Sequence, residues 1–527
     1  MLSTVINLVR LLHAGYVMAR EGVFGLVELP DLPPGPRLAL RLIRLIERKS
    51  ARRADAGARI SVAFNRLGPS YVKMGQFLAT RPDVVGREVA TELSLLQDRL
   101  EAFPRDEAVR MVEDALGAPI DQLFTDFGEP VAAASIAQVH PAFIEDEDGE
   151  THKVAVKVLR PGVARRFARD LQSFYLAAHI IERFHAPSRR LRPLAVVDTL
   201  ARSVELEMDL RLEAAALSEM AENTADDPGF RVPQVDWTRT SKGVLTMEWI
   251  AGRKLSDVDG IAEDGHDLVA LGANVIQSFL RHALRDGFFH ADMHQGNLFV
   301  SEEGDLVAVD FGITGRLDKA ERRFLAEILF GFITRDYMRV AEVHFEAGYV
   351  PKTQDVGVFA QAIRAIGEPI HGHKASDISM ARLLTQLFEV TELFAMTTQP
   401  QLIMLQKTMV VVEGVARSLD PGLDMWKTAE PVVRTWIERN LGPAGRIQDA
   451  GESLATLVRL AGELPMLAKR AERIVEEIDT MTTRGVKVEP DMMEAWARAR
   501  SRSNRLGAVA MWVIAVALVA IVFEGWW

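Results

Sequence analysis

The chain has no cysteine among its 527 residues. This absence excludes disulfide bonds, iron–sulfur clusters, thiolate zinc sites and a cysteine nucleophile. Lysine and arginine total 62 against 73 aspartate and glutamate, a formal net charge of −11 at pH 7. A general role in binding nucleic acid is therefore disfavoured. Hydrophobic residues make up 48% of the chain, which is high for a soluble protein and indicates membrane contact.

The longest uncharged run extends from Leu506 to Phe523 and predicts a transmembrane helix. Arginines precede it and tryptophans close the chain, which is typical of a helix whose N-terminal side is cytoplasmic. A buried core helix is the alternative. At the other end, Arg10 interrupts the apolar run 1–19, so we expect an amphipathic helix there and not a signal peptide.

Residues 1–55 are predicted to be helical and basic. Leu38, Leu42 and Leu45 recur at helical spacing, with arginines between them. Two interpretations stay open for this segment. It forms either a solvated helix packed on its domain or a surface that meets anionic lipid.

Two short motifs carry the clearest chemistry. Residues 290–297 read HADMHQGN and residues 310–312 read DFG. In this order they match the register of a kinase catalytic loop and of the metal-binding D-F-G that follows it. Asp292 is predicted to handle the attacking hydroxyl, whereas Asn297 and Asp310 are predicted metal ligands.

Strand patterns support a kinase-like arrangement around these motifs. A hairpin over 298–309, with its turn at Glu303-Gly304, should bring the two metal ligands side by side. The runs 154–158 and 243–250 predict buried strands, and Lys157 lies where a kinase lysine reaches the ATP phosphates. Such a lysine needs a carboxylate partner, and Glu207 and Glu213 are the candidates. An exposed, charged helix face is the alternative interpretation for those two glutamates.

The sequence departs from ordinary kinases in three places. Residues 132–139 read AAASIAQV where a glycine-rich phosphate loop is usual, which predicts a stiffer loop because alanine disfavours positive φ. A helical pattern follows the D-F-G directly, with no A-P-E, so we expect no activation segment that docks a polypeptide. Upstream, residues 70–83 read SYVKMGQFLATRPD, which has no counterpart in ordinary kinases; a charged helix end is its plain alternative.

With these motifs the chain resembles the UbiB family of atypical kinase-like proteins, the aarF-domain group. The resemblance covers residues 60–330 and rests on K-x-G-Q at 73–76, the alanine loop, E-x-D-x-x-x-E-A at 207–214 and the loop at 290–297. It implies an α+β, atypical two-lobed protein-kinase-like fold. An N-terminal helical extension would cover the site where a peptide binds, and a C-terminal transmembrane helix would anchor the chain.

The resemblance also implies an activity and a setting. ATP and Mg²⁺ are the expected cofactors, and membrane lipids and ubiquinone precursors (prenylphenols) are the expected stimulating ligands. The implied role is ubiquinone biosynthesis at the bacterial inner membrane, with the catalytic domain on the cytoplasmic side and a C-terminal single-pass anchor. Other quinone-biosynthesis proteins and a second copy of the chain, as a homodimer, are further expected partners, whereas nucleic acid is not.

Carried over by position, the resemblance assigns the site residues. Lys157 would contact the ATP phosphates and pair with Glu207, whereas Lys73 would reach in from the extension and pair with Glu213. Gly75 and Gln76 belong to the same extension. The remaining nucleotide contacts would come from the alanine loop and from a hinge that faces the adenine: Ala132, Ala133, Ala134, Ser135, Val139, Met247, Glu248 and Ile250.

The predicted domains follow from these motifs. They are basic N-terminal helices (1–55), the K-x-G-Q extension (56–130), a small lobe (131–252), a catalytic lobe (253–445), a helical extension (446–505) and the transmembrane helix with its tail (506–527). Three activities fit the sequence. An ATPase or small-molecule kinase is favoured over a protein kinase, because the activation segment is missing. A non-catalytic lipid-binding or scaffold protein is disfavoured, because Lys157, Asp292, Asn297 and Asp310 are all retained.

Overall fold

The structure, a computed structural model, describes residues 2–26, 56–79, 101–146, 148–184, 191–371 and 400–442, with a few positions between them. The chain divides into two compact units, Met1–Arg439 and Asn440–Trp527. The second unit lies almost wholly outside the described residues, and so do the predicted helical extension 446–505 and much of the basic segment 1–55.

The small lobe is built on an antiparallel six-stranded sheet in the order β1-β3-β4-β7-β6, with β2 paired to β3. Its strands are β1 Asp126–Phe127, β2 Ala132–Ala133, β3 Ala137–Glu145, β4 Thr151–Leu159, β6 Val235–Asp236 and β7 Val244–Glu248. The predicted strands over 154–158 and 243–250 are confirmed. The predicted extension 56–130 is not helical throughout, because β1 lies inside it and pairs with β3.

Side-chain alternation along β4 explains where Lys157 points. Val154, Val156 and Val158 face a buried cluster that α7 (Arg105–Leu116) and α8 (Ile120–Leu123) cover. Because successive side chains in a strand point to opposite faces, Ala155 and Lys157 lie on the other face. That face meets α11 (Leu210–Thr224) and the main hydrophobic core of the chain.

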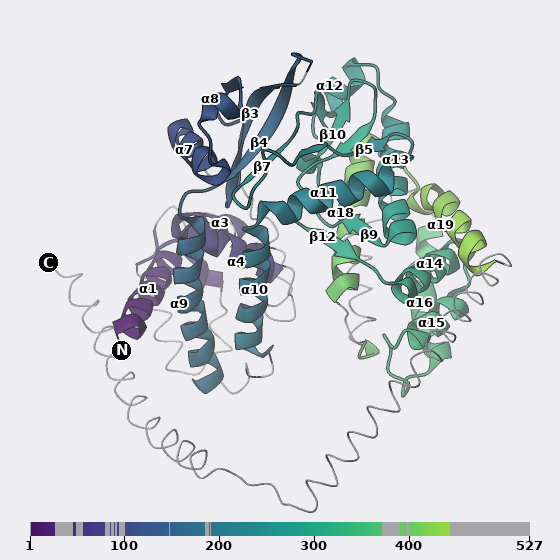
Figure 1. The fold of residues 1–527 in the computed structure, drawn as a ribbon. Coiled ribbons are helices and arrows are strands. Elements are labelled where there is room, and N and C mark those ends of the chain that lie inside the picture. The colour runs from purple at the N-terminus through teal and green to yellow at the C-terminus, as the bar shows by residue number, and fades with distance from the viewer. Residues whose placement is uncertain are drawn as a thin grey trace, which may run out of the picture. The chain divides into compact units, whose positions relative to one another are not determined.

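Helices from the N-terminal part of the chain pack together as a separate layer, which Figure 1 shows in purple and blue. Tyr71 anchors this layer, because its ring meets Phe174 edge-on with centroids 5.1 Å apart. The helices are α1 Leu2–Arg20, α3 Ala56–Leu67, α4 Pro69–Ala79, α9 Val163–Phe184 and α10 Pro193–Glu207, with η1 Val23–Leu26 after α1. The helix predicted over 1–19 is confirmed as α1, and its amphipathic character stays a prediction.

The larger lobe combines short strands with helices. One sheet has the order β5-β11-β10-β8, and β12 pairs with β9. These strands are β5 Phe230–Arg231, β8 Gly252–Lys254, β9 Phe288–His290, β10 Leu298–Ser301, β11 Leu306–Ala308 and β12 Thr314–Arg316. The helices are α12 Val258–Glu263, α13 Leu268–Arg281, α14 Lys319–Thr334, α15 Tyr337–Glu346, α16 Val356–His371, α18 Pro400–Leu419 and α19 Met425–Leu441, with single turns η5 His282–Asp286 and η6 Gln295–Asn297.

The predicted transmembrane helix is corrected. In the part of the chain that the structure describes, every helix is too short or too polar to cross a bilayer. The segment 506–527, to which that helix was assigned, lies outside the described residues. The fold class is therefore an α+β kinase-like fold to which no membrane-spanning helix is assigned.

Candidate active site

Lys157 lies at the centre of a buried cluster of charges. Its Nζ is 2.7 Å from Oε1 and 2.9 Å from Oε2 of Glu213, and 2.9 Å from Oδ1 of Asp310. The lysine comes from β4, Glu213 from the first turn of α11, and Asp310 from the segment after β11. One ammonium group therefore joins the small lobe, its neighbouring helix and the D-F-G.

The predicted partners of the two lysines are exchanged in the structure. Lys73 on α4 pairs with Glu207, with Nζ 2.6 Å from Oε2, whereas Lys157 pairs with Glu213. The prediction that Lys157 pairs with Glu207 and Lys73 with Glu213 is therefore wrong. The cause is a helix boundary between the glutamates, where the Asp209 side chain caps α11 by accepting from Arg211 N. Glu207 ends α10 beside α4, and Glu213 starts the helix that meets the sheet.

The charges in this cluster shift each other's pKa. Burial disfavours the ammonium of Lys157, but the charges of Asp310 and Glu213 outweigh burial and raise its pKa above the ordinary value. Burial also acts to raise the pKa of Asp310, yet Lys157 dominates and holds that pKa well below its usual range. Burial raises the pKa of Glu213 to about 7 against the opposing charge of Lys157. The lowered pKa keeps Asp310 ionised, which is the form that can bind a cation.

The catalytic loop is held from both sides of Asp292. Its backbone N–H donates to Nδ1 of the buried His290 at 3.0 Å, so the proton of that ring is on Nε2, which donates to Val309 O at 3.0 Å. The Asn297 side-chain amide donates to Asp292 O at 3.1 Å, and Val309 N donates to Asn297 O at 2.9 Å. The predicted hairpin is confirmed by the β10–β11 register, and it brings Asn297 next to the D-F-G.

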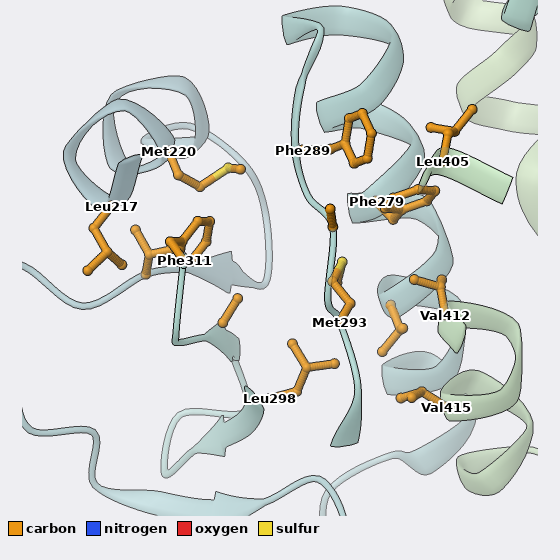
Figure 2. Close-up of a cluster of buried hydrophobic side chains, with 14 of the residues drawn as sticks. Leu217, Met220, Phe279, Phe289, Met293, Leu298, Phe311, Leu405, Val412 and Val415 are labelled. Carbon is orange, nitrogen blue, oxygen red and sulfur yellow. The ribbon is translucent and has the colours of Figure 1, made fainter. Parts of the chain in front are cut away.

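The D-F-G adopts a constrained backbone. Asp310 has a φ of 63°, in the left-handed region that residues other than glycine rarely occupy. Phe311 is 2% exposed and packs beneath α11 in the same cluster as Leu217 and Met220, as Figure 2 shows. The phenyl ring therefore ties the position of Asp310 to the helix that carries Glu213.

The segment after the D-F-G is fixed along its length. Ala291 N donates to Ile313 O at 3.0 Å, and β12 then pairs with β9. Arg316 forms an ion pair with Glu219 of α11, with Nη1 2.7 Å from Oε1. Asp318 begins α14 with a capping box that includes Glu321. This agrees with the prediction that the chain passes from the D-F-G into helix without an activation segment.

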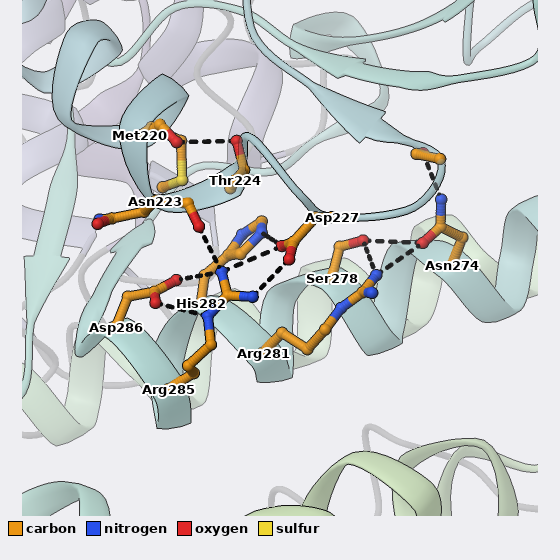
Figure 3. Close-up of polar contacts among 11 residues, drawn as sticks. Met220, Asn223, Thr224, Asp227, Asn274, Ser278, Arg281, His282, Arg285 and Asp286 are labelled. Carbon is orange, nitrogen blue, oxygen red and sulfur yellow. Dashed lines mark hydrogen bonds and ion pairs between the residues drawn. The ribbon is translucent and has the colours of Figure 1, made fainter.

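The loop after α11 is tied to the turn before β9 (Figure 3). Asp227 forms an ion pair with Arg285 of η5, and His282 Nε2 of the same turn lies 3.3 Å from its Oδ2. Arg285 also donates to Asn223 O at 2.7 Å. The turn η5 is a single π-helical turn, a form frequent at functional sites, and these contacts fix it directly before β9.

Comparisons with known proteins agree with this geometry. Residues 95–344 match the model of the ABC1 atypical kinase-like domain, and residues 363–424 match that of the UbiB helical domain. A protein named "Probable protein kinase UbiB" from Marinobacter nauticus is 36% identical over 520 residues, which cover 97% of this chain and 94% of that protein. The chain belongs to the UbiB family. Proteins of the same name from Aeromonas hydrophila and Pseudomonas putida are 37% and 38% identical, and the matches cover 96% and 88% of this chain and 92% and 86% of those proteins.

In this UbiB-family protein the alanine loop lies across the sheet from Lys157. Ala132 pairs with Val139, and Val139 pairs in turn with Lys157. Ala134 N donates to Ala137 O at 2.8 Å, which closes a tight turn around the buried Ser135. The segment thus forms a strand and a turn, and not the start of a helix. Ala133 belongs to the same strand as Ala132, so the predicted phosphate loop pairs with β3, the neighbour of the strand that carries Lys157.

The predicted hinge follows β7 of this UbiB-family chain. Met247 is buried opposite Ala155, and the Glu248 side chain accepts from Arg231 Nη1 at 2.8 Å. Ile250 follows directly, half-buried, at the start of the connection between the lobes. On α4, Gly75 is buried and Gln76 is half-buried beside Lys73, whose charge acts on the pKa of Asp310. The K-x-G-Q helix thus lies close enough to the site to influence it.

The donor set of this UbiB-family site fits magnesium. The Asp310 carboxylate and the Asn297 amide oxygen are hard oxygen donors, and the Asn297 side chain directs its NH₂ group to Asp292, which leaves the oxygen available. Among the described residues, no group of three or more histidine, aspartate or glutamate side chains forms a metal site by itself. Magnesium commonly binds through one or two protein ligands together with substrate phosphates, and the pair Asn297 and Asp310 fits this mode of coordination.

Proposed function

We propose that this UbiB-family protein is an ATPase or small-molecule kinase that associates with the bacterial inner membrane, on its cytoplasmic side, and supports ubiquinone biosynthesis. The observation that carries the proposal is Lys157 held between Glu213 and Asp310, with Asp292 and Asn297 beside them. These are the groups that bind ATP phosphates, hold the metal and orient the attacking oxygen in kinase-like phosphoryl transfer.

The residues support an in-line displacement at the γ-phosphorus. Lys157 would bind the α- and β-phosphates, and Asn297 and Asp310 would hold Mg²⁺, which when bound neutralises charge on the phosphate oxygens. Asp292 would accept the proton of the attacking hydroxyl or water as the new P–O bond forms. The bond between the γ-phosphorus and the bridging oxygen breaks, and ADP leaves with that oxygen. Positioning and charge neutralisation supply the rate enhancement.

A small acceptor or water is favoured over a polypeptide. The segment from Ile313 to Asp318 is occupied by strand pairing and a helix cap, so it offers no free backbone to a peptide. The K-x-G-Q helix α4 also lies near the site through Lys73. Both features support a substrate that is a small or lipid-like hydroxyl compound, with prenylphenol ubiquinone precursors as the class that family membership suggests.

Membrane association is supported by α1. Val5, Ile6, Val9 and Tyr16 are exposed on this helix, and Arg10 and Arg20 accompany them. Apolar side chains exposed on one helix beside basic residues are typical of an interfacial amphipathic helix. We therefore propose membrane lipids as ligands that stimulate the reaction.

The test is ATP hydrolysis by the full chain, measured with and without vesicles of anionic lipid and a prenylphenol. We expect Mg²⁺-dependent hydrolysis that both additions increase, and no phosphorylation of a generic protein substrate. Asp310→Asn should abolish the metal-dependent rate, because it removes a charged metal ligand. Unchanged turnover in that variant overturns the assignment of the active site. Efficient phosphorylation of the protein substrate instead supports the second candidate, a protein kinase. A disruption strain with normal ubiquinone would remove the biosynthetic role.

A further inference from the structure

The helix α18 lies behind the catalytic loop although it is distant in the sequence. It packs along α13, where Gly272 permits a close approach: a Cβ at that position would lie 3.0 Å from Ala416 O. Val412 and Val415 of α18 share the buried cluster with Met293, the residue that follows Asp292, and Figure 2 labels all three side chains. Residues of the matched helical domain therefore form part of the wall against which the loop rests.

Two side chains of α18 make hydrogen bonds to this loop. Thr408, 1% exposed, donates from Oγ1 to Ala291 O at 2.9 Å. Ser418 accepts from the Gln295 side-chain amide at 2.6 Å, and its own proton goes to Val415 O at 2.6 Å. The two contacts lie on either side of Asp292 in the sequence. They therefore restrain the loop at two points around the predicted catalytic carboxylate.

The Thr408 contact fixes the peptide group that leads into Asp292. The Ala291 carbonyl and the Asp292 N–H belong to one planar peptide unit. Thr408 donates to the carbonyl, and the N–H donates to His290 Nδ1 at 3.0 Å. Because both polar atoms of this plane are bound, the plane cannot rotate without breaking a buried hydrogen bond. The direction in which the Asp292 side chain leaves the backbone is set by that plane.

The geometry at Thr408 is unusual for a helical threonine. A threonine within a helix ordinarily donates to the carbonyl four residues earlier, here Met404 O at 2.8 Å. The hydroxyl has a single proton, and it shares that proton between Met404 O and the catalytic loop. The bond to Ala291 O is therefore additional to the bond that the helix itself provides for this hydroxyl.

We infer that Thr408 and Ser418 are positioning residues that hold Asp292 in its reactive orientation, so that the helical domain acts on the chemical step. This inference rests on the proposed ATP-dependent function. Neither side chain makes a hydrogen bond to Lys157, Asn297 or Asp310, so their effect is on the orientation of Asp292 and not on the binding of nucleotide.

Thr408→Val tests the inference, because valine keeps the shape of threonine and removes the hydroxyl. We expect kcat for ATP hydrolysis to fall by about tenfold while KM for ATP changes by less than about twofold, since one hydrogen bond in the transition-state geometry is lost. Thr408→Ser keeps the hydroxyl and should restore kcat to within about threefold of the native rate. Ser418→Ala should lower kcat less, because Gln295 is half-buried and water can replace the lost partner.

Thr334→Val is the matched control. Thr334 on α14 makes the same local bond, from Oγ1 to Phe330 O at 2.8 Å, and has no contact with the catalytic loop. It should leave kcat unchanged. A second measurement, amide hydrogen exchange of the peptide that contains residues 289–297, should show faster exchange in Thr408→Val and no change in Thr334→Val.

The outcomes separate this inference from the proposed function. If the native chain shows no ATP hydrolysis, the proposed function fails, and hydrogen exchange still decides whether Thr408 restrains the loop. If Thr408→Val keeps the native kcat and exchange rate, the positioning role is overturned. Equal loss in the serine and valine variants also overturns it, because the methyl group and not the hydroxyl would then matter.

Discussion

Lys157 and Asp310 form a part-buried ion pair, with Nζ 2.9 Å from Oδ1. The lysine that would bind phosphate and the carboxylate that would bind metal are therefore each other's partner until both ligands arrive. In the proposed function, nucleotide binding would exchange this ion pair for two others, between lysine and phosphate and between aspartate and cation. The strength of the ion pair thus opposes the binding of metal alone.

Removing the lysine should therefore increase the affinity for metal in the absence of nucleotide. We expect Lys157→Met to bind Mn²⁺ about tenfold more tightly than the native chain, because a positive charge next to Asp310 is gone. Electron paramagnetic resonance of free Mn²⁺ measures the affinity. Lys153→Met is the control, since the Lys153 ammonium lies over the Trp249 ring, 3.9 Å from its centroid, and not at the site. Equal affinity in the native and Lys157→Met chains would contradict the competition.

The exchanged lysine–glutamate pairs can be tested by double-mutant cycles. We expect coupling free energies of about 1–3 kcal/mol for Lys157 with Glu213 and for Lys73 with Glu207, because the pairs are direct and largely buried. The crossed pair, Lys157 with Glu207, should couple by less than about 0.5 kcal/mol. Urea unfolding without nucleotide gives the free energies. Larger coupling in the crossed pair would restore the pairing that the sequence suggested.

The helical charge pattern placed both glutamates near the lysines but could not assign them. Glu207 ends one helix and Glu213 lies in the first turn of the next, and a new helix axis starts at Asp209 between them. Which glutamate faces the sheet depends on the direction of that second axis, and tertiary packing sets this direction. The sequence could predict β4, β7 and the hairpin over 298–309, because alternating or buried β-branched residues and a turn glycine mark them locally.

The contact between α18 and the catalytic loop was not predicted for a different reason. It joins residues 117 positions apart, and neither Thr408 nor Ala291 belongs to a sequence pattern that predicts the contact. A threonine in an apolar helix is compatible with many buried positions. The packing register of α18 against α13 places this threonine where its hydroxyl contacts a loop carbonyl.

Stability should depend on pH through His282. Burial lowers its pKa from the ordinary value of 6.5, so the folded protein binds this proton less readily than the unfolded chain. The contribution to stability is full above pH 6.5 and is lost as pH falls below it, at a slope of at most about 1.4 kcal/mol per pH unit. Asp227 stays charged over this interval because its pKa is lowered.

Thermal unfolding at pH 7.5 and pH 5.5 measures this effect. The melting temperature of the native chain should fall more on acidification than that of His282→Gln, in which the titrating group is absent. An equal loss in the native chain and in His282→Gln would remove His282 as the cause.

Gly315 should tolerate no side chain. A Cβ there would lie 2.1 Å from Cζ of the Phe289 ring, which is itself buried, so the ring or the strand must move. We expect Gly315→Ala to destabilise the protein by about 1–3 kcal/mol in urea unfolding. Gly414→Ala, on α18 with open space around the position, should be neutral or stabilise by roughly 0.5–1 kcal/mol. A neutral Gly315→Ala would show that the β9–β12 pair is looser than described.

The contacts that hold the segment between Gly312 and Asp318 bear on how the protein can be regulated. This stretch is restrained by strand pairing, by the ion pair of Arg316 with Glu219 and by the capping box. Because of these contacts, we expect it not to change conformation around an added phosphate group. We therefore expect no regulation by a phosphorylation that reorders this segment. Under the proposed function, the rate of ATP hydrolysis would then depend on the concentrations of nucleotide, cation and stimulating lipid, and not on covalent modification of this segment.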